Sequence, residues 1–238
     1  MSEGRMKRIG IAWYGAGNIT SVARAVSVCG AEPVLIKSPE ELATLDAIVL
    51  PGVGAFGAAA DSLRESGLDD AILDFAEKGG PVLGICLGMQ LMFETSEESP
   101  GAEGLGLFKG GSNKLGAGKL RIGACDIRIA ARPGFKVPHT GWNQVDFEDS
   151  WPLGGESSDG RFYFTHSYKV VPADGAIIAG TARLSESGEG AVPMVAAIAA
   201  GNVIGVQFHP EKSGRRGIEL IGRFVAMAEG TKGRVALG

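Results

Sequence analysis

The chain has 238 residues, 45% of them hydrophobic and 21% charged, which suits one globular domain with a sizeable core. Its formal net charge of -4 excludes the strongly basic surface typical of nucleic-acid-binding proteins. The first residues, MSEGRMKRIG, lack an apolar signal segment, and no apolar run approaches the roughly 20 residues that span a bilayer. We therefore expect a cytoplasmic protein with a single domain over residues 1–238, in which residues 1–6 form a flexible extension.

The first hundred residues alternate between apolar runs and helical patterns. The apolar runs have the length of strands: RIGIAW (8–13), PVLIK (33–37), DAIVLPG (46–52) and PVLGIC (81–86). The helical patterns are NITSVARAVSVCG (18–30), LDDAILDFAEKGG (68–80) and LGMQLMFE (87–94). Such alternation with short links predicts parallel strands that are covered by helices on both faces.

From about residue 105 onward the pattern changes to closely spaced β-like runs. These are KLRIGACDIRI (119–129), WNQVDF (142–147), RFYFTH (161–166), YKVV (168–171), AIIAGTARL (176–184) and the hairpin-like MVAAIAAGNVIGVQF (194–208). An amphipathic helix over GIELIGRFVAMAEG (217–230) closes the chain, and SEESPGAEG (96–104) is expected to be a flexible loop. The sequence therefore predicts an α/β fold: an open, mostly parallel sheet flanked by helices, with an added mixed or antiparallel β region.

The three cysteines, Cys29, Cys86 and Cys125, include no Cys-x-x-Cys pair and cannot all be paired, so we expect a reducing compartment and no structural disulfide. Cys86 has a special setting, because it lies in GICLG (84–88), where a strand-like run ends and a helical pattern begins. A nucleophile elbow has this form, since its glycines let neighbouring backbone pass close to a strained turn. The alternative is a small buried cysteine packed against glycine-rich backbone.

A cysteine nucleophile needs a base, and His209 has the best setting among the three histidines. It ends an apolar run in VIGVQFHPEKSG (203–214), and Glu211 follows two residues later. On extended chain residues i and i+2 face the same way, so the carboxylate can orient the imidazole and stabilise its charged form. His139 and His166 have no acidic residue within two positions, and we expect both to be hydrogen-bonded structural or interface residues.

The segment LPGVGAFG (50–57) ends a strand in a glycine-rich loop. An acyl-transfer site needs two N–H donors where a carbonyl oxygen becomes negative. We expect one donor to be the N–H of Leu87, directly after the nucleophile. The other is expected from the loop, which contains Gly52, Val53 and Gly54. An ordinary strand-to-helix turn is the alternative for this loop.

Three further patterns point away from cofactors. YGAGN (14–18) follows a strand, but Thr20 stands where a dinucleotide-binding loop has its third glycine. Asn113 replaces the first glycine that a phosphate-binding loop would need in GGSNKLGAGK (110–119). The sequence has no H-E-x-x-H motif and no zinc-spaced Cys/His cluster, so we expect no cofactor and no metal. A basic group follows the candidate base, either as a solvated face or as a docking surface for an acidic partner: Lys212, Arg215 and Arg216.

Taken together, GICLGMQ, FHPE and LPGVGAF resemble the motifs of the class I (triad) glutamine amidotransferases. Longer segments are similar to those of the glutaminase subunits of imidazole glycerol phosphate synthases, namely YGAGNITSV, GICLGMQLMFETSEE, KVPHTGWNQV, FYFTHSY and VQFHPEKSG. The similarity runs from about residue 9 to the last helix. It has small departures, since Trp13 stands where aspartate is common and Thr140 where methionine is common.

This resemblance implies a glutaminase in which Cys86 attacks the side-chain amide of glutamine, His209 carries a proton to the departing ammonia, and Glu211 orients His209. It implies that Gln90 helps to bind glutamine. The ammonia would pass to a (β/α)₈-barrel cyclase, the partner in a heterodimer of histidine biosynthesis. The partner-facing residues implied by the resemblance are Asn18, Trp142 and Lys212. Two rival interpretations are a glutaminase that serves another synthase, against which KVPHTGWN argues, and a non-catalytic scaffold of the same fold.

Overall fold

The computed structural model describes residues 5–15, 17–107, 137–154, 160–184 and 192–228. The strands are β1 (Arg8–Ala12), β2 (Glu32–Ile36), β3 (Ala47–Gly52), β4 (Val82–Cys86), β5 (His139–Phe147), β6 (Arg161–His166), β7 (Ile178–Leu184), β8 (Val192–Ala200) and β9 (Val203–Val206). The α-helices are α1 (Ile19–Val28), α2 (Phe56–Glu65), α3 (Leu68–Glu77), α4 (Leu87–Leu91) and α5 (Gly214–Met227). Short 3-10 turns cover Pro39–Thr44, Gly175–Ile177 and Pro210–Lys212.

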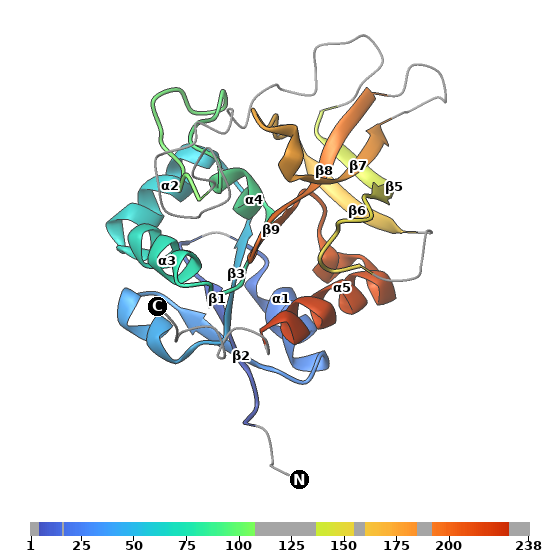
Figure 1. Cartoon of the computed structure of the whole chain (residues 1–238). Coiled ribbons are helices and arrows are strands. Elements are labelled where there is room, and N and C mark those ends of the chain that lie inside the picture. Colours follow the sequence, from blue (N-terminus) through green and yellow to red (C-terminus); the bar gives the residue numbers. More distant parts are fainter. Residues whose placement is uncertain (1–4, 16, 108–136, 155–159, 185–191, 229–238) are drawn as a thin grey trace.

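Within the described ranges the strands form one nine-stranded sheet, in the order β2-β1-β3-β4-β9-β8-β7-β5-β6 (Figure 1). The strands from β2 to β9 in this order are parallel, as the alternating pattern predicts. Every residue of β3, β4 and β9 is buried. Side chains of α1 and α5 join the core on one face of the sheet, and those of α2, α3 and α4 join the core on the other face. Burial on both faces explains why these strands read as continuous apolar runs.

The predicted antiparallel region is confirmed, and it extends the same sheet. Strand β9 is parallel to β4 along one edge and antiparallel to β8 along the other. The hairpin between β8 and β9 turns at Gly201 and Asn202, as its sequence predicts. The side-chain nitrogen of Asn202 donates to the carbonyl oxygens of Ala76 and Gly80, at 2.9 and 2.6 Å. The turn is thereby tied to the end of α3.

Two predicted elements differ from the structure. YKVV (168–171) belongs to no named strand, and within it Tyr168 forms only an isolated β-bridge. The carbonyl of Tyr168 accepts hydrogen bonds from the side chains of Gln90 and His166. The helix expected over residues 87–94 ends at Leu91. A later segment of the chain occupies the carbonyl at the end of α4, since the N–H of Leu105 donates to the Leu91 carbonyl oxygen at 2.7 Å. The run KLRIGACDIRI (119–129), with Cys125, lies outside the described residues.

The loop over residues 96–104 is fixed to the start of α2, a helix that the pattern analysis did not identify. The Glu98 carboxylate accepts from the Phe56 N–H at 2.8 Å, and the Ser99 hydroxyl accepts from the Gly57 N–H at 3.0 Å. These bonds satisfy two of the N–H groups that a helix leaves free at its first turn. This segment, expected to be flexible, is therefore held at both of these positions.

The N-terminal residues 1–4 lie outside the described residues. Arg5, placed in the expected extension, is held by the body of the protein, because its guanidinium contacts the two carboxylate oxygens of Asp46 at 2.7 and 2.8 Å. Asp46 is buried and also accepts from the backbone N–H of Arg8 at 2.9 Å. Contacts to the body of the protein are therefore made by Arg5, which precedes the first strand.

The carboxyl ends of the central parallel strands meet at one edge of the sheet. Gly52 at the end of β3 pairs with Cys86 at the end of β4, and Ile85 pairs with Val206 at the end of β9. The last residues of these strands and the segments that directly follow them contain every residue that the sequence proposes for catalysis and oxyanion binding. Open α/β sheets place their ligands at this edge.

Candidate active site

Cys86 occupies a strained turn between β4 and α4. Its φ of 55° makes it the one non-glycine residue with positive φ in the described part of the chain, and residues with a Cβ rarely adopt this conformation. The glycines around it make room for the turn. A Cβ on Gly88 would lie 1.7 Å from the Leu50 carbonyl oxygen, and one on Gly84 would lie 2.8 Å from the Gly88 carbonyl oxygen. The elbow therefore depends on close backbone packing that only glycine permits.

The sulfur of Cys86 has two polar neighbours. The backbone carbonyl of Thr165 lies 3.8 Å from Sγ and can accept the thiol hydrogen. The side-chain nitrogen of Gln207 lies 3.6 Å from Sγ and donates to it. Cys86 is only 6% exposed, and it also interacts with the imidazole of His209.

His209 and Glu211 form a buried pair directly after β9. Nδ1 of His209 lies 2.9 Å from Oε1 of Glu211, and the two side chains are 2% and 1% exposed. Burial opposes a charge on the imidazole, but interactions with Cys86 and with the Glu211 carboxylate outweigh it and raise the pKa of His209 to about 9. The imidazole is thus suited to hold a positive charge beside the sulfur.

The backbone of His209 is anchored to β6. Its N–H donates to the Tyr163 carbonyl at 2.8 Å, and its own carbonyl accepts from the Ser213 hydroxyl at 2.6 Å. In the described part of the chain, Nε2 of His209 and Oε2 of Glu211 are buried and make no hydrogen bond. Such atoms are rare in a folded protein and call for an explanation. A proton carried between Nε2 and a reacting group is the chemistry that this open position permits.

A pocket of about 360 Å³ opens beside Cys86. Its lining includes Val53, Gly54, Cys86, Leu87, Gln90, Glu98, Pro138, Thr165, His166, Ser167 and Tyr168. Five residues proposed from the sequence are therefore brought together around one cavity. Gly52 packs against Leu87, one of the residues that line the pocket. A Cβ on Gly52 would lie 2.6 Å from the Tyr14 hydroxyl oxygen and 2.7 Å from the Leu87 Cβ.

Tyr14 contacts the end of β3, where the glycine-rich loop begins, and was not assigned a role from the sequence. Its hydroxyl donates to the carbonyl of Pro51, the residue that precedes Gly52. The ring is buried, and burial together with the charge of Cys86 raises the pKa of the Tyr14 hydroxyl. It therefore remains a neutral donor at physiological pH.

His139 and His166 contact each other across β5 and β6. Nδ1 of His139 lies 3.2 Å from Nε2 of His166, and its Nε2 lies 3.0 Å from Oδ1 of Asn143. Nδ1 of His166 lies 2.8 Å from the Tyr168 carbonyl oxygen. Burial, aided by the neighbouring His139 and His209, lowers the pKa of His166 to about 3, so His166 is neutral although it lines the pocket.

Sequence patterns gave no role to Glu98 or Gln207, which also surround Cys86. Gln207 is completely buried although it follows the apolar run VIGV (203–206). A polar side chain within a buried run must find hydrogen-bond partners, and this was the available signal. Glu98 lines the pocket through a loop that carries no comparable signal.

Two of the proposed partner-facing residues share one exposed cluster. Trp142 is 53% exposed and lies edge-on against Tyr163, with 6.0 Å between ring centroids. The ammonium group of Lys212 lies 6.0 Å from the centroid of the same Tyr163 ring. Asn18 is separate from this group and immediately precedes α1.

The remaining members of the basic group are paired within the chain. Arg215 and Arg216 both contact the carboxylate of Glu219, at 3.0 and 3.2 Å. Exposed pairs of this kind contribute little free energy, but they reduce the net positive charge that a partner would meet. Of this group, Lys212 therefore has the clearest geometry for docking.

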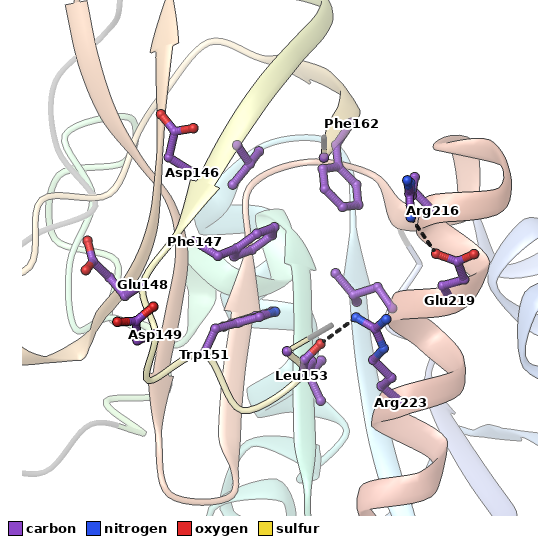
Figure 2. Close-up of a pocket in the computed structure, with 14 residues that line it drawn as sticks. Asp146, Phe147, Glu148, Asp149, Trp151, Leu153, Phe162, Arg216, Glu219 and Arg223 are labelled. Atoms are coloured by element: carbon purple, nitrogen blue, oxygen red, sulfur yellow. Dashed lines mark hydrogen bonds and ion pairs between the residues drawn. The ribbon is translucent and has the colours of Figure 1, made fainter. Parts of the chain in front are cut away.

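A second cavity, of about 520 Å³, lies between β5 with the segment after it and helix α5 (Figure 2). Phe147 and Trp151 stack on its wall with ring centroids 4.9 Å apart. Arg223 reaches across from α5 and donates to the Leu153 carbonyl at 3.0 Å, as Figure 2 shows. No residue proposed for catalysis or oxyanion binding lines this cavity. The smaller pocket beside Cys86 is therefore the candidate active site.

The described residues contain neither a metal-binding group nor a membrane-spanning helix. No group of three or more His, Cys, Asp or Glu side chains is arranged to hold a metal ion in this part of the chain. No helix in the same ranges is long and apolar enough to cross a membrane. Cys29 and Cys86 are both free thiols.

The sequence is similar to those of known proteins over most of its length. Residues 14–227 match the family described as glutamine amidotransferase class-I. The imidazole glycerol phosphate synthase subunit HisH of Geobacillus thermodenitrificans is 40% identical, over 94% of this chain and 98% of that protein. The HisH subunit of Methanopyrus kandleri is 43% identical, over 93% of this chain and 98% of that protein.

Solved structures of the same fold are more distant in sequence. The structure of PurLQS from Thermotoga maritima superposes with a TM-score of 0.66 at 20% identity, over 93% of this chain and 98% of that chain. A crystal structure of a glutamine amidotransferase gives a TM-score of 0.64 at 19% identity, over 93% of this chain and 98% of that chain. Together with the family match and the HisH relatives, this shared fold leads to one conclusion: the chain belongs to the class-I glutamine amidotransferase family.

Proposed function

We propose that this chain is the glutaminase subunit of imidazole glycerol phosphate synthase, which hydrolyses glutamine to glutamate and ammonia. The observation that carries the proposal is the cluster of Cys86, His209 and Glu211. Cys86 stands on a turn of positive φ beside a pocket, and His209 pairs with a buried carboxylate at 2.9 Å. The extended similarity to HisH subunits supports the choice of this synthase over others.

In the proposed mechanism the Cys86 thiolate attacks the side-chain amide carbon of glutamine. His209 then gives its proton to the departing nitrogen, so that the C–N bond breaks, ammonia leaves and a glutamyl thioester remains on sulfur. Water attacks the thioester with His209 as base, which releases glutamate and restores the thiolate. Glu211 holds the imidazole in the tautomer and orientation that both steps need.

The oxyanion that forms in each step needs two N–H donors. We assign one to Leu87, which follows the nucleophile at the start of α4, and the other to Val53 or Gly54. These three residues line the same pocket as Cys86. Gly52 contributes by letting Leu87 and Tyr14 approach the loop, and Gln90 lines the wall where glutamine would bind.

The ammonia is proposed to pass to a synthase partner, a (β/α)₈-barrel cyclase in a cytoplasmic heterodimer. The exposed cluster of Trp142, Tyr163 and Lys212 supports this, since aromatic and cationic side chains often anchor interfaces. Asn18 is proposed to contact the same partner. We also propose that the partner activates the glutaminase, because the loop over residues 51–54 must direct an N–H at the oxyanion.

The experiment combines the chain with its cyclase partner and measures glutamate release from glutamine. We expect activity that is much higher in the complex than in the isolated chain, and that Cys86→Ala abolishes it. Cys29→Ala is the matched control, because Cys29 is also a free thiol but contacts the Ile218 carbonyl. Full activity of Cys86→Ala in the complex would refute the nucleophile assignment.

The non-catalytic alternative makes a different prediction. A glutamine analogue that carries a diazo-ketone should label Cys86 in the complex, since the thiolate attacks its electrophilic carbon. Absence of labelling, in a chain that still binds the partner, would favour a scaffold.

A further inference from the structure

Gln207 is a completely buried amide whose role the mechanism above leaves open. It follows β9 and precedes the candidate base by two residues, and its exposed fraction is 0%. Its Nε2 lies 3.6 Å from the sulfur of Cys86. A buried amide beside a nucleophile raises the question of whether its N–H or its carbonyl oxygen faces the sulfur.

The neighbouring groups determine this orientation. The carbonyl oxygen of Tyr168 can only accept hydrogen bonds, so the side-chain atom of Gln90 at 3.2 Å from it must be the nitrogen. The same Gln90 nitrogen lies 3.2 Å from a side-chain atom of Gln207, which must therefore be the oxygen. The remaining end of the Gln207 amide, its NH₂ group, then faces Cys86.

The series of hydrogen bonds from Tyr168 through Gln90 to Gln207 begins at a backbone carbonyl, whose acceptor role cannot change. Nδ1 of His166 also lies 2.8 Å from the Tyr168 carbonyl oxygen, and only a protonated Nδ1 can donate there. Two donors, one from His166 and one from Gln90, thus hold the same acceptor. Rotation of the Gln207 amide by a half turn would place its NH₂ against the Gln90 NH₂ and its oxygen against the sulfur, so a flip costs two hydrogen bonds.

We infer that Gln207 stabilises the thiolate of Cys86 by donating a hydrogen bond from Nε2 to Sγ. The inference rests on the proposed function only in taking Cys86 as the nucleophile. The Thr165 carbonyl, at 3.8 Å from Sγ, is an acceptor and favours the neutral thiol. The Gln207 amide is a donor and favours the thiolate. Together with the imidazolium of His209, it holds the charged sulfur in place before the attack on glutamine.

The test measures how fast iodoacetamide alkylates Cys86 in the full-length chain as a function of pH, with the modified peptides quantified by mass spectrometry. Gln207→Leu removes the donor and keeps a buried side chain of similar length. We expect the alkylation midpoint of Cys86 to move up by about one pH unit, so that alkylation at a pH below both midpoints becomes about tenfold slower. Gln207→Glu is expected to move it further, because an oxygen then faces the sulfur. In the complex, kcat should fall with little change in KM for glutamine.

Asn202→Ala is the matched control, since Asn202 belongs to the same hairpin and donates to the carbonyls of Ala76 and Gly80 away from the sulfur. It should lower stability without moving the alkylation midpoint. An unchanged midpoint in a folded Gln207→Leu chain, or in Gln207→Glu if the first variant does not fold, would overturn the inference. A moved midpoint, in a chain whose wild type releases no glutamate even with the partner present, would sustain the inference and refute the proposed function.

Discussion

Nδ1 of His209 lies 2.9 Å from Oε1 of Glu211, and both side chains are almost completely buried. The interaction fixes the imidazole with Nε2 directed away from the carboxylate, because the two ring nitrogens lie on opposite sides. It also supplies part of the negative charge that keeps the imidazole protonated. Each consequence can be measured separately.

Glu211→Gln should reduce kcat for glutamine hydrolysis in the complex by roughly 10³- to 10⁴-fold, as losses of an orienting carboxylate do in other triads. The shape of the side chain is kept, so KM should change little. Steady-state kinetics with the partner present measures both constants. Glu219→Gln is the control, because Glu219 pairs with Arg215 and Arg216 on α5 and lines the second cavity. Equal losses in the two variants would contradict the role given to Glu211.

The raised pKa of His209 predicts how stability depends on pH. A folded-state pKa of about 9 against an ordinary value of 6.5 means that the folded protein binds the proton more tightly than the unfolded chain does. The proton on His209 therefore adds to the free energy of unfolding. This addition is fully present below pH 6.5 and is lost as the pH rises through 9. Urea unfolding of wild type and His209→Asn should therefore differ more at pH 6 than at pH 9.5. A stability difference that grows with pH would show that the pKa of His209 is lowered in the folded protein and not raised.

Gly88→Ala should destabilise the protein strongly. The added Cβ would lie 1.7 Å from the Leu50 carbonyl oxygen, and backbone cannot move aside as a flexible side chain can. We expect a loss of about 3 kcal/mol or more, or failure to fold. Gly175→Ala is the matched control, because a Cβ there meets no atom within 4 Å. Thermal unfolding compares the two variants, and equal melting temperatures would contradict the packing account of the elbow.

Trp142→Ala should weaken the complex with the cyclase partner. An exposed tryptophan that lies against Tyr163 has the features of an interface anchor, for which a loss of about 2 kcal/mol, or roughly 30-fold in Kd, is usual. Calorimetric titration with the partner measures the change. Val28→Ala is the control, because Val28 is 66% exposed but ends α1, at the opposite edge of the sheet from the active site. No change for Trp142→Ala would remove this residue from the proposed interface.

Local sequence patterns were sufficient for much of the parallel half of the sheet. The runs that became β1, β3 and β4 are buried on both faces, so their apolar character is continuous and easy to identify. The elbow was also predictable, because the need for glycine on either side of Cys86 is a local steric property. His209 and Glu211 were identified from a spacing of two residues, and they pair as expected, although Glu211 lies in the 3-10 turn Pro210–Lys212 and not on extended chain.

Other features depend on contacts between segments that are distant in sequence. Gln207 acquires its orientation from Gln90 and Tyr168, and no local pattern shows that these three meet. Helix α4 ends where the N–H of Leu105 donates to the Leu91 carbonyl. Helical periodicity in the sequence cannot reveal such a contact. The Tyr168 carbonyl likewise accepts from the side chains of Gln90 and His166, contacts that the apolar run YKVV (168–171) does not reveal.

The position of β9 between β4 and β8 determines when the candidate site becomes complete during synthesis of the chain. The ribosome releases Cys86 long before it releases β9, which both carries the chain to His209 and joins the two halves of the sheet. A nascent chain that ends at Ala200 has the thiol but lacks its imidazole, its carboxylate and the strand beside it. The thiol of Cys86 therefore gains its proposed base, the paired carboxylate and the neighbouring strand only once the segment from β9 onward has been made.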